Sequence, residues 1–115
     1  MQFKRADRVG DLIRKEIAVM LLGDIRDPRV ALVTITKVAV SDDLQQAKVY
    51  FTALGDEEER REALEGLRSA SGFIKRTLAH RVSLRRIPAL RFTYDKSIEY
   101  AGHIEQLIES TRDEG

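Results

Sequence analysis

The sequence predicts an α+β fold, a single domain in which helices pack on one face of a three-stranded sheet. Segments with apolar residues at helical spacing alternate with segments in which every second residue is apolar. A short polar turn joins the first two strand-like segments, as in a hairpin. The 115 residues provide one core and no second domain, so these segments are expected to pack together.

The first predicted element is a helix over residues 8–22. Its apolar stripe consists of Val9, Leu12, Ile13, Ile17, Met20 and Leu21. Gly23 can end this helix, and Asp27-Pro28 disfavours its continuation. We interpret Asp27-Pro28-Arg29 first as this stop signal, although its arginine could also contact a binding partner.

Residues 30–40 are rich in Val, Ile and Thr, which predicts a strand. The apolar parity changes between Ile35 and Val38, so a bulge or bend is expected near Lys37. Residues 41–44 indicate a turn, in which Asp42 and Asp43 are expected to shape the hairpin rather than bind a cation. The second strand alternates through Ala47, Val49, Phe51 and Ala53.

Two helices are predicted to meet at a kink. After Gly55, the acidic residues 56–59 start a helix, because negative charge in the first turn opposes the helix dipole favourably. Its stripe is Ala63, Leu64, Leu67 and Ala70, and a second stripe follows at Ile74, Leu78 and Val82. The segment 69–72, Ser-Ala-Ser-Gly, is too short for a free loop and poor in helix formers.

The last strand and a final helix complete the predicted order. Pro88 precedes a strand in which Leu90, Phe92 and Tyr94 alternate with Arg91 and Thr93. A helix over 97–110 is expected to bury Ile98, Ala101, Ile104, Leu107 and Ile108. The predicted order is α-β-β-α-kink-α-β-α, with one domain over 1–110 and a short charged tail over 111–115.

Charge is segregated along the chain although the net charge is only +1. Residues 66–94 contain no acidic side chain, and their seven cations are Arg68, Lys75, Arg76, Arg81, Arg85, Arg86 and Arg91. The other 86 positions carry 13 basic and 19 acidic residues. A one-signed field of this kind attracts a polyanion, and nucleic acid is the commonest polyanion for a small intracellular protein. The alternative is a merely solvated face, although such a face normally mixes signs.

Several function classes have no support in the sequence. There is no cysteine, which excludes disulfides and thiolate metal sites and fits a reducing cytosol. The two histidines, His80 and His103, fall on different predicted helices, without a nucleophile at recognisable spacing, a phosphate loop or a metal motif. No apolar run is long enough for a membrane span, and the first residues do not resemble a signal peptide. We therefore expect a cytoplasmic protein that is not an enzyme, has no cofactor or small-molecule substrate, and is monomeric off its partner.

The order of the elements resembles a KH domain of the ribosomal-protein type, type II. An ordinary KH domain clamps single-stranded nucleotides with a Gly-x-x-Gly loop at the kink. This chain has no Gly-x-x-Gly, and Ala70-Ser71-Gly72 stands in its place. A generic KH protein that binds single-stranded RNA is the alternative interpretation, and the missing loop and the lack of an aromatic row argue against it.

Several separated motifs resemble the bacterial ribosome-binding factor A family in their joint order. They run from about Arg5 to Ile108 and are Arg8-Val9, Asp27-Pro28-Arg29, Val40-Ser41-Asp42-Asp43-Leu44, Ala47-Lys48-Val49-Tyr50, Ala70-Ser71-Gly72, Arg86-Ile87-Pro88, Leu90, Phe92 and Asp95-Lys96-Ser97. The resemblance implies an interrupted KH fold with Ala-x-Gly at the kink. It also implies a non-catalytic assembly factor that binds free 30S subunits and 16S rRNA, and assists late maturation, 5′-end rRNA processing and cold adaptation.

Helical geometry selects candidate contacts around the kink. With Ile74 at the buried centre, Gly72, Arg76, Ala79 and Ser83 point to solvent and Lys75 lies on the flank. Small residues let a phosphate backbone approach, and the helix N-terminus after the kink offers N–H groups to an anion. The predicted RNA-binding residues are Ser69, Ala70, Ser71, Gly72, Lys75, Arg76, Arg85 and Arg86.

Three neighbouring side chains are treated separately. Arg91, on the outward parity of the last strand, can extend the footprint. Arg81 falls about 20° from Ile74 by helical counting, so it is expected to run past the core and is left out of the set. Phe73 is expected to pack under the sheet rather than stack on a base.

Overall fold

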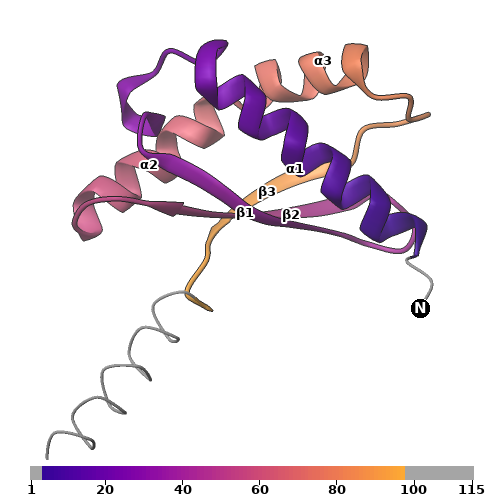
Figure 1. Ribbon diagram of the computed structural model, residues 1–115, viewed down its shortest axis with the longest axis horizontal. Helices are drawn as coiled ribbons and strands as arrows, with labels where there is room; N and C mark the ends of the chain where they lie inside the picture. The colour runs from indigo at the N-terminus through magenta and orange to yellow at the C-terminus, as the bar shows by residue number, and fades with distance from the viewer. Residues whose placement is uncertain (1–3, 98–115) are drawn as a thin grey trace, which may run out of the picture.

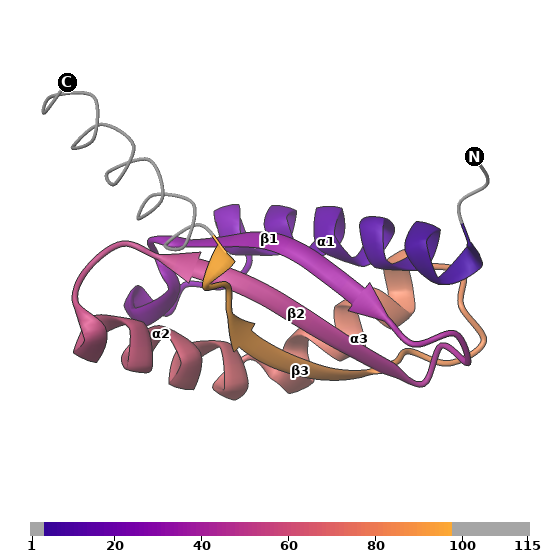
Figure 2. The same cartoon turned by 90° about the horizontal axis from the view of Figure 1, so that it is seen from below.

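In the part of the chain that the structure describes, three helices cover one side of a three-stranded sheet and none covers its other side (Figures 1 and 2). The computed structural model describes residues 4–97. The strand order is β1-β2-β3, with β1 antiparallel and β3 parallel to the central β2. This α+β arrangement is the predicted one, and its order through β3 is that of a type II KH domain. The predicted helix over 97–110 and the tail over 111–115 lie outside the described residues.

Helix α1, Arg5–Gly23, begins three residues earlier than predicted and ends at the predicted glycine. The earlier start buries Ala6 in addition to the expected Val9, Ile13, Ile17 and Met20. A side chain at Gly10 would collide with the carbonyl oxygen of Val38, so glycine lets α1 lie directly against β1. This contact fixes α1 over the outer strand of the sheet.

The strand prediction for residues 30–40 was wrong at its beginning, because residues 28–30 form a 3-10 turn. This turn, η1, covers Pro28–Val30, and strand β1 covers Val33–Val40. The Asp27 carboxylate accepts a hydrogen bond from the Arg29 N–H at 2.9 Å, and proline occupies the first turn position. Val30 is buried by packing against α2 instead of pairing in the sheet.

Strands β1 and β2, Gln46–Ala53, form the predicted hairpin with the predicted bulge. The register shifts between Ile35 and Lys37, which leaves Thr36 as the extra residue. At the turn, the Asp43 carboxylate accepts hydrogen bonds from Ser41 Oγ at 2.6 Å and the Gln45 N–H at 3.1 Å. These donors lower the pKa of Asp43, which confirms a turn-forming role.

Helices α2, Glu57–Ser69, and α3, Ser71–Arg81, connect β2 to β3, Ala89–Tyr94. Asp56 and Glu59 form a reciprocal capping box, which confirms that the acidic cluster starts α2. The stripes meet the sheet as predicted, except that Leu64 and Ala70 are only half-buried. The core lies between the helices and one face of the sheet, and its members from α2, α3 and the sheet include Ala63, Leu67, Ile74, Leu78, Val82, Val49, Phe51 and Phe92.

Candidate nucleic-acid interface

The kink is reduced to a single residue, Ala70. It is both the C-cap of α2 and the N-cap of α3, with φ −84° and ψ −4°. Its N–H donates to the Gly66 carbonyl at 3.0 Å, and its carbonyl accepts from the Ile74 N–H at 2.9 Å. The two helices therefore join without the four-residue loop of an ordinary KH domain.

No side chain caps the start of α3. Helix α2 has a capping box, whereas no side chain caps α3, because its N-cap residue is Ala70. The first N–H groups of a helix lack intrahelical acceptors and carry the positive end of the dipole. Two serines flank Ala70 at this end. Ser69 is exposed and Ser71 is half-buried. The absence of a side-chain cap agrees with the expectation that this helix start can approach an anion, which stays a prediction.

The outer face of α3 has the composition that helical counting predicted. Ile74, Leu78 and Val82 are buried. The exposed positions are Gly72, Lys75, Arg76, Ala79 and Ser83. We call Ser69, Ala70, Ser71, Gly72, Lys75 and Arg76 the kink surface. Within residues 4–97, neither of its two cations has an ion-pair partner.

Arg76 folds back over Gly72. A Cβ built on Gly72 would lie 3.3 Å from Arg76 Nη1, and it would meet no other atom of residues 4–97 within 4 Å outside its two chain neighbours and its own helix backbone. The glycine thus keeps the backbone at the beginning of α3 bare, with a guanidinium beside it. Backbone N–H groups and a guanidinium are both strong donors to phosphate oxygens.

The turn η1 packs against α2 beside the kink, a neighbour that the sequence did not predict. A Cβ on Gly66 would lie 2.8 Å from Val30 Cγ1 and 3.1 Å from Arg29 Cβ, so glycine permits this contact. Arg29 Nη2 lies 2.6 Å from Asp27 Oδ2 and donates to Ser69 Oγ at 3.4 Å. Hydrogen bonds from Arg29 lower the pKa of Asp27, and the carboxylate raises the pKa of Arg29. The Asp-Pro-Arg motif therefore braces Ser69 and one side of the kink surface.

A shallow hollow of about 260 Å³ lies where the 24–27 segment meets the kink. Its lining includes Arg26, Ser69, Ala70 and Phe73. The prediction that Phe73 packs under the sheet was wrong, because the side chain is 38% exposed at the rim of this hollow. Phe73 is the third residue of α3. An exposed ring beside free cations is suited to stacking on a base.

Arg81 does not run past the core as helical counting indicated. Its guanidinium lies 3.1 Å from Asp24 Oδ2 and 3.8 Å from Glu16 Oε2. Glu16 belongs to α1 and Asp24 follows its last residue, so the arginine ties α3 to α1. Two acidic partners remove Arg81 from the set of cations available to a ligand.

Arg85 and Arg86 are separated from the kink surface by the length of α3. They lie in the connection to β3, which Figure 1 shows beyond the far end of α3. Both side chains are exposed, between buried Val82 and buried Pro88. The Ala89 N–H donates to the Gln45 carbonyl at 2.9 Å, which anchors the connection to the hairpin turn. The two arginines thus form a second cationic group beyond the end of α3. They do not form one cluster with Lys75 and Arg76.

Arg91 has the outward parity predicted for it, but this direction leads away from the kink surface. Its side chain is exposed on β3, opposite the face on which Phe92 is buried. Since the helices cover the Phe92 side, Arg91 faces the open side of the sheet (Figure 2). It does not extend the footprint on α3.

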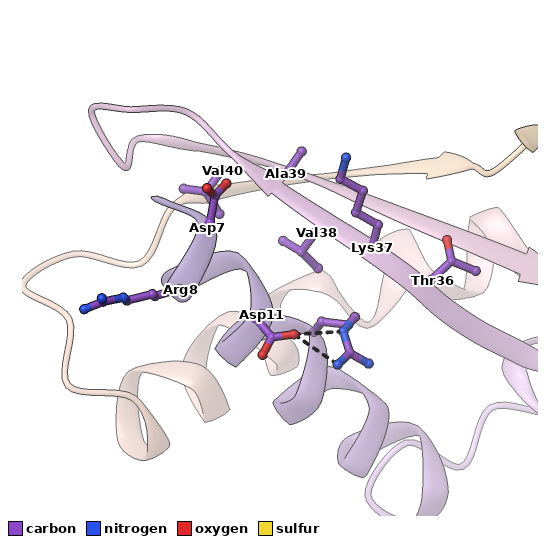
Figure 3. A pocket seen from close by; sticks show the side chains of 9 residues that line it. Asp7, Arg8, Asp11, Thr36, Lys37, Val38, Ala39 and Val40 are labelled. Carbon is purple, nitrogen blue, oxygen red and sulfur yellow. Dashed lines mark hydrogen bonds and ion pairs between the residues drawn. The ribbon is translucent and has the colours of Figure 1, made fainter. Parts of the chain in front are cut away.

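A larger hollow, about 780 Å³, lies between α1 and the outer edge of β1 (Figure 3). Its charges are mixed, with Asp7, Arg8, Asp11 and Arg14 on α1 and Lys37 on β1. Asp11 is 3.0 Å from Arg14 and 3.1 Å from Lys15, and hydrogen bonds from Lys15 and Arg14 lower its pKa. Two carboxylates among three cations make this hollow a poorer match for a polyanion than the kink surface.

Two other kinds of site find no support among residues 4–97. No group of three or more His, Cys, Asp or Glu side chains there could hold a metal ion. None of the helices in this part of the chain combines the length and apolarity needed to cross a membrane.

Comparison with known sequences identifies close relatives of this chain. The family model described as "Ribosome-binding factor A" matches residues 5–108. A curated protein of that name from Syntrophobacter fumaroxidans is 52% identical over 110 residues, which cover 94% of each chain.

Solved structures give the same result. The crystal structure of ribosome-binding factor A from Thermus thermophilus superposes with a TM-score of 0.68 at 30% identity, covering 77% of this chain and 94% of that one. A Thermus thermophilus homology model fitted into the cryo-EM map of a 30S complex with that factor gives a TM-score of 0.65 at 28% identity, covering 83% and 97%.

Proposed function

Because this chain belongs to the ribosome-binding factor A family, we propose that it binds the free 30S ribosomal subunit and assists its assembly. Family membership rests on a match over residues 5–108 and on a relative that is 52% identical. The Thermus thermophilus factor has been fitted into a map of its 30S complex, which supports the same partner here.

The kink surface is the proposed point of contact with 16S rRNA. The observation that carries this assignment is the pair Lys75 and Arg76, exposed beside an uncapped helix start, with no carboxylate bound to either among residues 4–97. Cations held by carboxylates would have to give up those partners before binding phosphate, whereas these two would not. Arg85 and Arg86 are proposed as a second phosphate contact at the other end of α3.

The proposed role within assembly is late maturation, including processing of the 5′ end of 16S rRNA in a bacterial cytoplasm. A bacterial strain lacking the protein is then expected to accumulate precursor 16S rRNA with an unprocessed 5′ end, more strongly at low temperature. Normal 5′ ends at all temperatures would contradict this part of the proposal and leave subunit binding untouched.

Co-sedimentation tests the proposed binding directly. The protein is expected to move with free 30S subunits and not with whole ribosomes. Lys75→Glu with Arg76→Glu reverses two phosphate contacts, so we expect binding to weaken by about 100-fold, or about 2.7 kcal/mol. The melting temperature should stay the same, because both side chains are exposed.

A matched control makes the same charge change elsewhere. Arg5→Glu with Lys15→Glu reverses two exposed cations on α1, and it should leave 30S binding within about threefold of the unmodified protein. Equal losses in both variants would mean that only net charge matters. Binding to short oligonucleotides without any binding to subunits would favour a generic KH protein.

A further inference from the structure

The side of the sheet opposite the helices is a second cationic surface. It presents Thr34, Thr36, Lys37 and Ala39 from β1, Gln46, Lys48, Tyr50 and Thr52 from β2, and Ala89, Arg91 and Thr93 from β3. We call these residues the open sheet face. Figure 2 looks onto this side, and α1, α2 and α3 all lie behind it. The three strands contain three cations, and no Asp or Glu.

The cross-strand register brings the three cations together. Lys48 on the central strand stands opposite Arg91 on β3, and Lys37 on β1 stands opposite Tyr50. Neighbouring strands are about 4.8 Å apart, so the three charges occupy a patch only about three strands wide. Within residues 4–97, none of the three forms an ion pair with a carboxylate.

The bulge in β1 aims Lys37 at this patch. Figure 3 shows Val38 directed toward α1, whereas Lys37 and Ala39 point to the opposite side of the strand. The extra residue, Thr36, donates from Oγ1 to Asp95 Oδ2 at 2.6 Å. A bulge of this kind re-aims side chains without ending the strand pairing.

Tyr50 supplies an aromatic ring at the centre of the patch. Its side chain is half-buried between β1 and β3, and Lys48 Nζ lies 5.9 Å from the ring centroid. A tyrosine ring on a sheet, flanked by cations, can stack one base while the cations hold the adjoining phosphates.

Within residues 4–97, carboxylates stand at both ends of the face: Asp42 and Asp43 in the hairpin turn, and Asp95 at the other end. Asp95 follows β3, and its oxygens accept hydrogen bonds from Thr36 Oγ1, Ser97 N and Ser97 Oγ. These bonds, with a smaller contribution from Lys37, lower the pKa of Asp95 and keep it ionised. The three cations lie between these two acidic ends, so a polyanion is expected to meet the middle of the face.

We propose that the open sheet face binds single-stranded RNA, with one base stacked on Tyr50 and phosphates held by Lys37, Lys48 and Arg91. The choice of RNA as the polyanion rests on the proposed function, and the site itself does not depend on the kink surface. A protein partner fits less well, because protein interfaces need apolar anchors and are depleted in lysine, whereas threonines surround this patch.

Binding of a dye-labelled single-stranded oligouridylate, followed by fluorescence anisotropy, tests the charges. Lys48→Glu with Arg91→Glu should weaken binding at least about tenfold and lower the slope of log Kd against log salt by about 1.4, because two phosphate contacts are lost. The control, Arg5→Glu with Lys15→Glu, should stay within about threefold. Unchanged binding by the sheet variant would overturn the proposal.

Two substitutions at one position test stacking. Tyr50→Phe keeps the ring and should bind within about twofold of the unmodified protein, whereas Tyr50→Leu should bind about tenfold more weakly. Thermal melting of both variants checks that the sheet is intact. If Tyr50→Leu binds like Tyr50→Phe, the base does not stack on this ring.

Ultraviolet crosslinking of the unmodified protein on free 30S subunits gives a readout that no folding defect can affect. We expect a nucleotide adduct on the peptide that contains Tyr50. With benzoylphenylalanine in place of Thr52, crosslinks should form to 16S rRNA. Crosslinks to a ribosomal protein or to residues 98–115 of this chain, or no crosslink at all, would overturn the proposal.

The kink variant separates the two proposals. If Lys75→Glu with Arg76→Glu binds subunits normally while the sheet variant fails, the kink surface is wrong and the open sheet face stands. If the kink variant fails and the sheet variant binds both subunits and oligouridylate normally, the open sheet face is wrong and the proposed function stands.

Discussion

Two arginine–glycine pairs near the kink have the same residue types and opposite surroundings. Arg29 Cβ would lie 3.1 Å from a Cβ on Gly66, which is buried, and its guanidinium is 2.6 Å from Asp27 Oδ2. Arg76 Nη1 would lie 3.3 Å from a Cβ on Gly72, which is exposed, and no carboxylate binds it among residues 4–97.

The difference teaches that charge alone does not identify a binding residue in this chain. The Arg29–Gly66 pair is closed by packing and by Asp27, so its cation braces the fold. The Arg76–Gly72 pair is exposed, and no carboxylate holds its cation among residues 4–97, which is why we propose it as a phosphate contact. Arg81 follows the first pattern, with Asp24 and Glu16 as its partners.

The largest expected effect breaks the closed pair. Gly66→Ala places a methyl group 2.8 Å from Val30 Cγ1, and η1 must move to accept it. We expect a loss of about 1–3 kcal/mol in the free energy of unfolding, measured by urea denaturation. Full stability of this variant would mean that η1 is not packed on α2 as described.

The same substitution in the open pair is expected to act in the other direction. Gly72→Ala meets only the flexible end of Arg76, and it improves helix propensity by up to about 1 kcal/mol. The added methyl group should hinder phosphate approach and weaken 30S binding by about 1 kcal/mol, or roughly fivefold. A variant that is more stable and binds as well as the unmodified protein would show that the bare backbone at Gly72 has no part in binding.

The smallest expected effect concerns the charge that closes the first pair. Arg29 lowers the pKa of Asp27 below its ordinary value of 3.8. The stabilisation is therefore complete above that value and is lost as the pH falls through the lower pKa of the folded state. Asp27→Asn keeps the cap acceptor but removes the charge, so its stability should fall less between pH 5 and pH 2 than that of the unmodified protein. Parallel curves for the two proteins in acid denaturation would contradict the pairing.

Local patterns predicted most of the fold because they involve one element at a time. The stripe at Ile74, Leu78 and Val82 correctly indicated the buried and outer faces of α3. The parity change after Ile35 correctly indicated the bulge. Each of these depends on the spacing of side chains along a helix or strand, which the sequence contains directly.

The errors arose where two distant elements meet. Val30 was predicted in a strand and packs on Gly66, and Phe73 was predicted beneath the sheet and is exposed. Helical counting put Arg81 near the apolar centre of α3. Arg81 is the last residue of that helix, and its side chain pairs with Glu16 and Asp24 instead. The spacing of side chains along one helix or strand does not predict which distant element packs beside Val30, Phe73 or Arg81. For the same reason, the sequence did not show that Arg85 and Arg86 lie at the other end of α3 from the rest of the candidate site.

The salt dependence of 30S binding tests most directly whether Lys75 and Arg76 hold the RNA. The dissociation constant is measured from low to high salt for the unmodified protein, for Lys75→Gln with Arg76→Gln, and for the control Arg5→Gln with Lys15→Gln. We predict that the kink variant lowers the slope of log Kd against log salt by about 1.4–1.8, because two phosphate contacts are lost, and that the control keeps the full slope. An unchanged slope in the kink variant, or an equal fall in the control, would contradict this prediction.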